Sequence, residues 1–328
     1  MTSWNKKRVL VTGAGGFIGS HLTERLVEEG ATVRALVHYN ALGRWGWLDH
    51  SPHAKQIEII SGDITDRDCI RQAVKGREII FHLGALIAIP YSYQVPLSYV
   101  RTNTEGTINV LQSAREEGVE RVVHTSTSEV YGTAQYVPID ERHPLKGQSP
   151  YAASKIGADK MAEAFHLSFN LPVVTVRPFN TFGPRQSTRA IIPTIIVQCL
   201  LGDTIHLGNL HPTRDLNFVT NTVDGFLLAA SIPPAVGQTF NLGSSREISV
   251  GELAGMIAKM VGKPIKIESE DNRLRPQGSE VERLLADNIL AKTVLGWQPK
   301  VSLEEGLVRT IAWIKDNLDF YRGNTYAY

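Results

Sequence analysis

Cysteine and net charge are both scarce in this sequence. Its two cysteines, Cys69 and Cys199, are far apart and lack the spacing of metal ligands, which indicates core thiols in a reducing compartment and predicts no metal site. Basic residues number 34 and acidic residues 33, so the net charge is +1. This balance argues against a broad nucleic-acid-binding face, and we expect no nucleic-acid partner.

Long hydrophobic stretches are missing as well. No run of about eighteen apolar residues occurs, and residues 1–8 carry no apolar signal core. We therefore expect a cytoplasmic, soluble protein with no membrane partner. The 328 residues suffice for a large core, either as one α/β unit or as two lobes that share a cleft.

Short apolar runs alternate with amphipathic stretches through the first half of the chain. We expect strands at residues 8–12, 32–37, 57–60, 79–85 and 121–124, and helices at residues 20–29, 95–117 and 150–169. This alternation predicts an α/β fold with a Rossmann-type, doubly wound parallel sheet. The pattern then loosens, which suggests a dinucleotide-binding domain at residues 1–178 and a smaller α/β substrate lobe at residues 179–328, with some segments crossing between them.

A glycine-rich turn lies between the first strand and the first helix. Gly13, Gly16 and Gly19 follow a GxxGxxG spacing rather than GxGxxG. Glycines here permit a tight turn, close backbone approach to a pyrophosphate and close helix packing. The helix N-terminus then offers its N–H groups to the phosphates. This segment is a candidate dinucleotide site.

The second strand ends in His38, Tyr39 and Asn40. An acidic residue at this tip would bind the adenosine ribose 2′-hydroxyl of NAD, and an Arg would favour the 2′-phosphate of NADP. Neither stands there, although Arg44 is near. Asn40 could serve a 2′-hydroxyl, so the choice between NAD and NADP stays open.

A pair of side chains on the helix at residues 150–169 carries the chemistry. Tyr151 and Lys155 are four positions apart and share one helix face. A Tyr that acts as a base near neutral pH needs its pKa lowered from about 10 to about 7, which takes ~4 kcal/mol. The Lys155 ammonium and an oxidised nicotinamide, both positive, favour the phenolate. Hydroxyls and one carboxylate, Glu129, also follow the strand at residues 121–124, where ligands of parallel sheets bind.

These residues resemble those of the extended short-chain dehydrogenase/reductases of the NAD-dependent epimerase/dehydratase family, which modify nucleotide sugars. The resemblance covers nearly the whole chain. Besides the glycine turn, Thr127 and the Tyr–Lys pair, it rests on Asp63-Ile64, His82-Leu83-Gly84-Ala85, Arg177-Pro178-Phe179-Asn180, Arg214-Asp215, Asn241-Leu242-Gly243 and Leu295-Gly296-Trp297.

The resemblance implies a role for individual residues. Thr127, Tyr151 and Lys155 would form the hydride-transfer machinery, with Thr127 bonded to the sugar hydroxyl that Tyr151 deprotonates. A tightly bound NAD or NADP, recycled within each turnover, would contact Gly13, Gly16, Phe17, Ile18, Gly19, Asn40, Asp63, Ile64, Leu83, Tyr151 and Lys155. The substrate would contact Thr127, Asn180, Arg214 and Arg275.

Within the family, Glu129 is the informative residue. Ser126-Thr127-Ser128-Glu129 looks like the segment of the 4,6-dehydratases, in which this Glu removes the C5 proton of the sugar. The departure is Ser128, because deoxythymidine-diphosphate-glucose dehydratases carry an Asp there as the acid for the C6 hydroxyl. GDP-mannose 4,6-dehydratases resemble this chain in having Thr-Ser-Glu, so Glu129 would handle both protons, with Ser128 beside it.

Three alternatives remain. UDP-glucuronate decarboxylases also carry Thr-Ser-Glu, but their tyrosine motif differs from Ser149-Pro150-Tyr151-Ala152-Ala153-Ser154-Lys155. Nucleotide-sugar 4-epimerases need no base at Glu129 and generally lack one. Non-enzymatic dinucleotide sensors typically lack the Tyr–Lys pair that is intact here.

Segments outside the catalytic motifs favour a substrate class. Tyr39-Asn40, Trp45-Gly46-Trp47-Leu48-Asp49 and His211-Pro212-Thr213-Arg214-Asp215 look like the legionaminic-acid-pathway dehydratases, which act on nucleotide-linked N-acetylglucosamine. The resemblance therefore implies a UDP- or GDP-linked N-acetylhexosamine substrate. We also expect a homodimer, because the two long helices carry apolar residues on more than one side (Ile108, Leu111, Ile156, Met161 and Phe165) and could form a four-helix interface.

Overall fold

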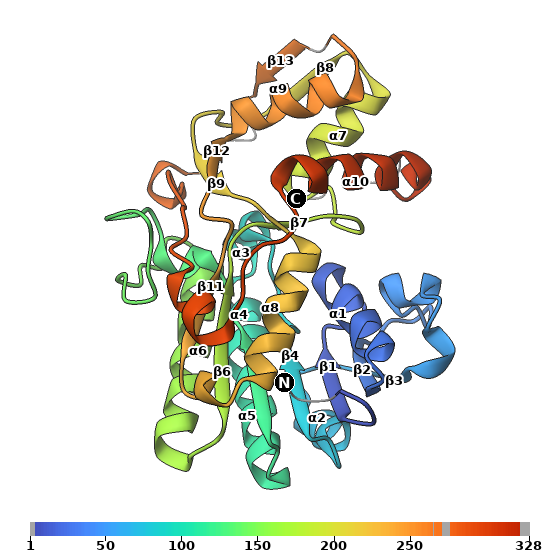
Figure 1. Cartoon of the computed structure of the whole chain (residues 1–328), viewed down its shortest axis with the longest axis vertical. Helices are drawn as coiled ribbons and strands as arrows, with labels where there is room; N and C mark the ends of the chain where they lie inside the picture. The colour runs from blue at the N-terminus through green and yellow to red at the C-terminus, as the bar shows by residue number, and fades with distance from the viewer. Residues whose placement is uncertain (1–3, 265, 271–275, 322–328) are drawn as a thin grey trace.

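The centre of the molecule is a seven-stranded parallel sheet, seen in the computed structural model, which describes residues 4–264, 266–270 and 276–321 (Figure 1). Each strand pairs in parallel with its neighbours, and the predicted doubly wound fold is confirmed. The spatial order is β3 (Glu58–Gly62), β2 (Thr32–His38), β1 (Arg8–Thr12), β4 (Ile79–His82), β5 (Arg121–Thr125), β6 (Val173–Pro178) and β11 (Thr239–Leu242).

Helices cover both faces of the sheet. Alternate side chains of each strand point to opposite sides, and the apolar ones on each face pack against helices. In β1, Val9 and Val11 pack in the core with α1 (Phe17–Glu28) and α8 (Val219–Ser231). Leu10 packs in the other core with α2 (Arg67–Val74), α5 (Gly106–Glu117) and α6 (Pro150–Phe169). Apolar side chains on both faces explain why the central strands read as continuous hydrophobic runs.

Two predicted helices differ from their expected forms. The segment expected at 95–117 consists of α4 (Pro96–Tyr99), a π-helical turn (Val100–Glu105) and α5. The turn contains Asn103, which is fully buried and bonds to both backbone groups of Leu86. Helix α1 also begins at Phe17 rather than at residue 20, because Gly16 is its N-cap.

The rest of the chain builds a smaller part above the carboxyl end of the sheet (Figure 1). This part contains three two-stranded sheets, formed by β7 with β10, β8 with β13, and β9 with β12. The bounds of the remaining elements are α3 (Ile89–Gln94), β7 (Thr181–Phe182), α7 (Ile191–Leu201), β8 (Thr204–Leu207), β9 (Thr213–Asp215), β10 (Asn217–Phe218), β12 (Glu247–Ser249), α9 (Val250–Val261), β13 (Lys266–Ser269) and α10 (Leu303–Asp316).

Strand β11 comes from this later part of the chain and forms an edge of the central sheet. The division of the chain at residue 178 into two functional parts stays a prediction.

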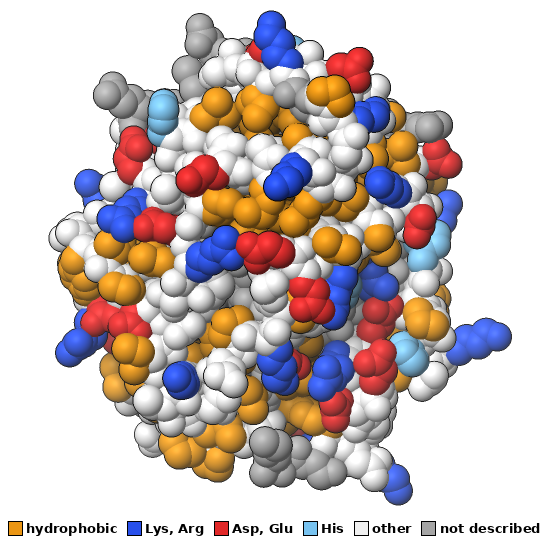
Figure 2. Space-filling model, turned by 45° about the horizontal axis from the view of Figure 1, so that its top comes forward, with side chains coloured by type: hydrophobic (Ala, Val, Ile, Leu, Met, Phe, Trp, Pro, Cys, Tyr) orange, Lys and Arg blue, Asp and Glu red, His pale blue; other side chains and the backbone are white. Residues whose placement is uncertain are grey.

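Basic and acidic side chains are interspersed on the face shown in Figure 2. Within the described residues, no helix is both long and apolar enough to cross a membrane.

Candidate functional site

A cleft of about 1110 Å³ opens at the carboxyl end of the sheet and is also lined by residues of the later part of the chain. Side chains at the ends of β1, β2, β4, β5 and β6 meet there, as expected for a parallel sheet. The sequence-predicted residues that line it are Gly13, Gly16, Phe17, Ile18, Gly19, Asn40, Leu83, Thr127, Ser128, Glu129, Tyr151, Lys155, Asn180 and Arg214.

Two predicted site residues that the structure describes, Asp63 and Ile64, are not among those that line the cleft. Asp63 accepts hydrogen bonds from the backbone and hydroxyl of Thr65, at 2.8 and 2.9 Å, and so stabilises its own turn. Ile64 is buried in the core beside α5. Arg275 lies outside the described residues. The cofactor role of Asp63 and Ile64 therefore stays a prediction.

The glycine turn forms a close-fitting cradle at the start of α1. Gly13 has φ +68°, and a Cβ added to it would lie 2.8 Å from the Gly84 backbone nitrogen. A Cβ on Gly19 would collide with the Gly13 carbonyl oxygen. Gly16 is the N-cap of the helix and no side chain caps the first turn, whose residues Phe17, Ile18 and Gly19 line the cleft. This arrangement fits the pyrophosphate of a dinucleotide.

The exit of β4 is fixed beside that cradle by Thr12 and His82. The Thr12 hydroxyl accepts hydrogen bonds from the backbone N–H groups of Leu83 (3.1 Å) and Gly84 (3.0 Å) and lies 2.8 Å from His82 Nδ1. Burial lowers the pKa of His82 well below its usual value, so the ring is neutral and Nδ1 accepts the Thr12 proton. The motif His82-Leu83-Gly84 signalled this segment, but not its contact with Thr12.

Thr127, Tyr151 and Lys155 come together as predicted. Tyr151 and Lys155 are both buried on one face of α6, which begins with Ser149 as its N-cap. Thr127 precedes a 3₁₀ turn (Ser128–Tyr131), and its hydroxyl bonds to the Tyr151 phenol. Lys155 Nζ donates to the Thr125 carbonyl oxygen at 2.5 Å. The hydroxyl, phenol and ammonium groups therefore all face the cleft from fixed positions.

The electrostatic environment keeps the Tyr151 phenol neutral when the protein is considered alone. Burial raises its pKa, the bond from Thr127 lowers it, and the nearby charge of Glu129 raises it. Burial also lowers the pKa of Lys155 to about 8, an effect that Asp159 partly offsets. Deprotonation of Tyr151 therefore needs a further positive charge in the cleft, which an oxidised nicotinamide carries.

Glu129 lies on the 3₁₀ turn directly after Thr127. Its backbone N–H donates to the Thr127 hydroxyl at 3.2 Å, and its side chain is half-buried at the cleft. Ser128 beside it is buried. The charge of Glu129 raises the pKa of the Tyr151 phenol. The carboxylate and the candidate base are therefore close enough to act on one bound sugar.

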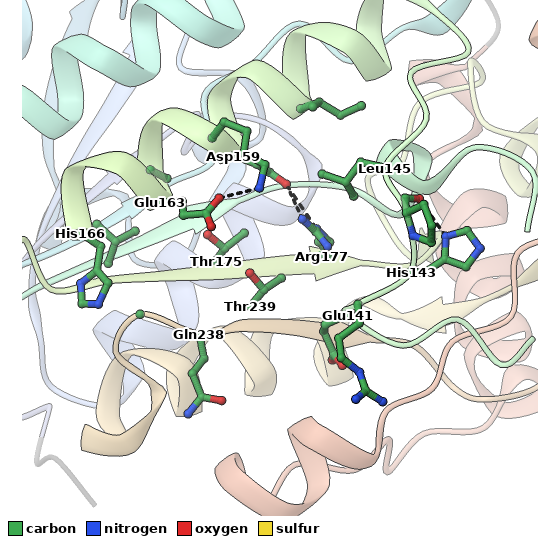
Figure 3. Close-up of a pocket in the computed structure, with 17 residues that line it drawn as sticks. Glu141, His143, Leu145, Asp159, Glu163, His166, Thr175, Arg177, Gln238 and Thr239 are labelled. Atoms are coloured by element: carbon green, nitrogen blue, oxygen red, sulfur yellow. Dashed lines mark hydrogen bonds and ion pairs between the residues drawn. The ribbon is translucent and has the colours of Figure 1, made fainter. Parts of the chain in front are cut away.

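A buried ionic cluster that the sequence did not predict lies under these residues. Asp159 accepts bonds from His124 (3.0 Å), Ser126 (2.7 Å) and Arg177 (3.1 Å). Arg177 also donates to the Tyr131 hydroxyl at 2.9 Å. Asp159 and Arg177 also line a second cavity of about 460 Å³ (Figure 3). The only available signal was an acidic residue four positions after Lys155, on the buried face of α6.

We expect Asp159→Asn to destabilise the fold by about 3–5 kcal/mol, because it leaves the Arg177 charge buried without its partner. The folded-state pKa of Asp159 is lowered to about 2, chiefly by its His124 bond against the opposing effect of burial. Its stabilising contribution is thus complete above the unfolded pKa of about 3.9 and is lost as pH falls toward 2. Urea unfolding at neutral and acid pH measures both effects.

Lys160→Ala is the matched control, on the next residue of α6. The Lys160–Glu163 pair is exposed, and such pairs contribute little to stability. If Asp159→Asn and Lys160→Ala have the same free energy of unfolding, the buried cluster does not stabilise the fold as proposed.

Two predicted substrate residues lie at the other side of the cleft. Asn180 Oδ1 is buried and has no hydrogen-bond partner among the described residues, so it can accept from a bound ligand. Arg214 is 9% exposed, and its guanidinium lies 3.3 Å from the Glu280 carboxylate. Arg189 also lines the cleft and was not predicted.

Within the described ranges, no cluster of His, Cys, Asp or Glu could hold a metal ion.

Similar proteins are known from both sequences and structures. Residues 10–310 match the family model described as GDP-mannose 4,6 dehydratase. The chain is 36% identical to a UDP-glucose 4-epimerase of Mycolicibacterium smegmatis over 94% of this chain and 99% of that protein. It is 32% identical to UDP-glucuronic acid decarboxylase 1 of Xenopus tropicalis over 98% of this chain and 75% of that protein.

Among solved structures, the fold matches DesIV, a dTDP-glucose 4,6-dehydratase from Streptomyces venezuelae with NAD and TYD bound. The TM-score is 0.88 at 29% identity, and the match covers 96% of this chain and 99% of that chain. The named reactions of these similar proteins are an epimerisation, a decarboxylation and a dehydration.

Proposed function

The chain belongs to the GDP-mannose 4,6-dehydratase family of NAD-dependent nucleotide-sugar enzymes, and we propose that it is a nucleotide-sugar 4,6-dehydratase. The observation that carries this proposal is the position of the Glu129 carboxylate. A carboxylate faces the same cleft as Thr127 and Tyr151, and its charge acts on the Tyr151 phenol. An epimerisation at C4 needs no such base, whereas elimination across C5 and C6 does.

Tyr151 and Glu129 would carry out the proton transfers at C4, C5 and the C6 hydroxyl that lead to elimination. Tyr151 takes the C4 hydroxyl proton, with Thr127 bonded to the same oxygen. Gly13, Gly16 and Gly19 would hold the dinucleotide, which would supply the hydride chemistry at C4 and C6. Because the C4 ketone acidifies the C5 hydrogen, Glu129 removes that proton and gives one to the C6 hydroxyl, which leaves as water. C5 then takes up a proton from water and Tyr151 releases the proton that it took from the C4 hydroxyl, so the net change is loss of one water.

The proposed substrate is UDP- or GDP-linked N-acetylglucosamine, as in the legionaminic-acid-pathway enzymes whose motifs this chain resembles. Arg214 and Arg275 would bind the diphosphate, and Asn180 would bond to the sugar-phosphate. Arg214 is held near the cleft by its contact with Glu280 at 3.3 Å. An incoming diphosphate would compete with that carboxylate for the guanidinium.

Mass spectrometry of a reaction that offers UDP- and GDP-N-acetylglucosamine together tests this function. A 4,6-dehydratase gives a product lighter by one water from the preferred nucleotide. Unchanged mass with every N-acetylhexosamine nucleotide would favour an epimerase. Loss of carbon dioxide from a nucleotide-linked glucuronate would favour a decarboxylase.

We further propose a homodimer that pairs the outer faces of α4, α5 and α6. Of the five apolar residues expected there, Leu111 and Phe165 instead belong to the monomer's own core. Ile108, Ile156 and Met161 are half-buried and pack only in part against the monomer's own clusters, and Leu97 in α4 is 59% exposed. The proposed interface would therefore use Leu97 together with the half-buried Ile108, Ile156 and Met161.

Light scattering at micromolar concentration should give twice the chain mass of 36.2 kDa. Leu97→Glu should shift the protein toward monomer, because it places a charge in an apolar interface. Leu201→Glu, at an exposed leucine on α7, is the control and should stay dimeric. A monomer mass for the unmodified chain would contradict the proposal.

A further inference from the structure

The end of the cleft beside the glycine turn lacks the carboxylate that an NAD-specific site uses. Strand β2 ends at the exposed residue His38, and Arg44 lines the cleft close by in the chain. Among the described residues that line the cleft, only Glu129 and Glu280 are acidic. Glu129 lies beside Thr127, and Glu280 contacts Arg214, so both belong to the catalytic and substrate side.

Asn40 is engaged in holding its own loop. Its side-chain nitrogen donates to the Arg44 carbonyl oxygen at 2.7 Å and to the His38 carbonyl oxygen at 3.4 Å. Its side-chain oxygen accepts the Arg44 backbone N–H at 3.1 Å. Both N–H donors of the amide are therefore in use. This geometry differs from the sequence-based expectation, in which Asn40 itself met a ribose hydroxyl.

The loop that carries Arg44 is also fastened to the glycine turn. The Trp47 backbone N–H donates to the Gly15 carbonyl oxygen at 3.0 Å, and the Trp45 backbone N–H donates to the Asp49 carboxylate at 3.1 Å. Gly15 lies so close that a Cβ on it would collide with the Trp45 carbonyl oxygen. The backbone of Arg44 is thus fixed at both sides, next to the candidate pyrophosphate cradle.

The Arg44 side chain is exposed and forms no ion pair with any residue that the structure describes. An unpaired guanidinium and an imidazole at the tip of β2, without a carboxylate, suit a dianion better than a hydroxyl. We propose that this chain selects NADP over NAD. Arg44 binds the 2′-phosphate, His38 lies beside it, and Asn40 is the positioning residue that holds Arg44.

This inference rests on the proposed function only in requiring a bound dinucleotide, and it is tested without sugar. NADP⁺ and NAD⁺ are titrated into dinucleotide-free protein by calorimetry. The unmodified chain should bind NADP⁺ at least about tenfold more tightly, because one charge-assisted phosphate contact is worth that factor. Raising the salt concentration should reduce the preference.

Variants separate the roles of the three residues. Arg44→Ala should weaken NADP⁺ binding about tenfold and leave NAD⁺ binding within about twofold. Arg142→Ala, at an arginine whose side chain is 91% exposed away from this cleft, is the matched control and should change neither affinity. Asn40→Ala should weaken NADP⁺ alone, whereas a direct bond from Asn40 to a ribose hydroxyl would make it weaken NAD⁺ as well.

A gain-of-function variant keeps the inference testable if Arg44→Ala folds poorly. His38→Asp introduces a carboxylate at the tip of β2, which repels a 2′-phosphate and can accept a ribose hydroxyl bond, so the preference should shift to NAD⁺. Equal or tighter binding of NAD⁺ by the unmodified chain would overturn the inference. Equal weakening of both dinucleotides by Arg44→Ala would also overturn it. Neither outcome bears on whether the sugar loses water.

Discussion

Tyr151→Phe should reduce turnover by about 10²–10⁴-fold, the usual effect of losing a general base. The substitution removes only the phenolic oxygen that bonds to Thr127. The ring stays packed at 6.2 Å from the Tyr99 ring, so the fold and the shape of the cleft should be retained. Affinities for dinucleotide and nucleotide sugar, measured by calorimetry, should therefore stay near those of the unmodified chain.

Tyr99→Phe is the matched control. Tyr99 is also buried beside α6, but its hydroxyl donates to the Ala88 carbonyl oxygen at 2.5 Å, and the residue does not line the cleft. This variant should keep most of the activity. Retention of more than a tenth of the activity by Tyr151→Phe would show that another group deprotonates the C4 hydroxyl.

Glu129→Gln should stop the reaction after C4 oxidation. The amide has nearly the same shape as the carboxylate but cannot take the C5 proton. Tyr151 still acts in this variant, because oxidation precedes elimination. Reduced dinucleotide should accumulate to about one equivalent per site, seen by its absorbance. The bound sugar should be a 4-ketone that still carries its C6 hydroxyl, seen by mass spectrometry.

Glu280→Gln removes the other carboxylate that lines the described cleft. It contacts Arg214, so its loss should change the affinity for the nucleotide sugar without trapping reduced dinucleotide. Complete water loss by Glu129→Gln would overturn the role assigned to Glu129. The same ketone trapped by both variants would indicate a general effect of charge in the cleft.

The features predicted well from sequence depend on contacts between neighbours in the chain. The buried strands carry β-branched apolar runs, and Tyr151 and Lys155 share a face because any helix brings residues four apart together. The glycine turn was predictable because Gly13 needs a positive φ and Gly19 must approach a carbonyl oxygen. Each of these follows from local geometry alone.

The features that were missed depend on partners distant in sequence. Asp159 could not be singled out from the sequence, because its partners His124, Ser126 and Arg177 come from β5, the segment after it, and β6. The π-helical turn before Gly106 has no clear sequence pattern. Its buried Asn103 bonds to Leu86 and Ser154, which only the folded chain brings together.

Asn40 shows a different limit. Its position at the tip of β2 predicted a ligand contact, and the residue does line the cleft. An amide in a short loop can equally bond to the backbone of that loop, and here it closes on Arg44. Sequence position alone therefore placed Asn40 at the candidate cofactor site but could not show that its amide bonds to its own loop.

The measurement that tests the central claim most directly is the mass of the product formed from UDP- or GDP-N-acetylglucosamine in heavy water. A 4,6-dehydratase that uses Glu129 on C5 must give a 4-keto-6-deoxy sugar that has lost one water and carries one deuterium at C5. A product of unchanged composition, or one that has lost water without deuterium at C5, would contradict the account.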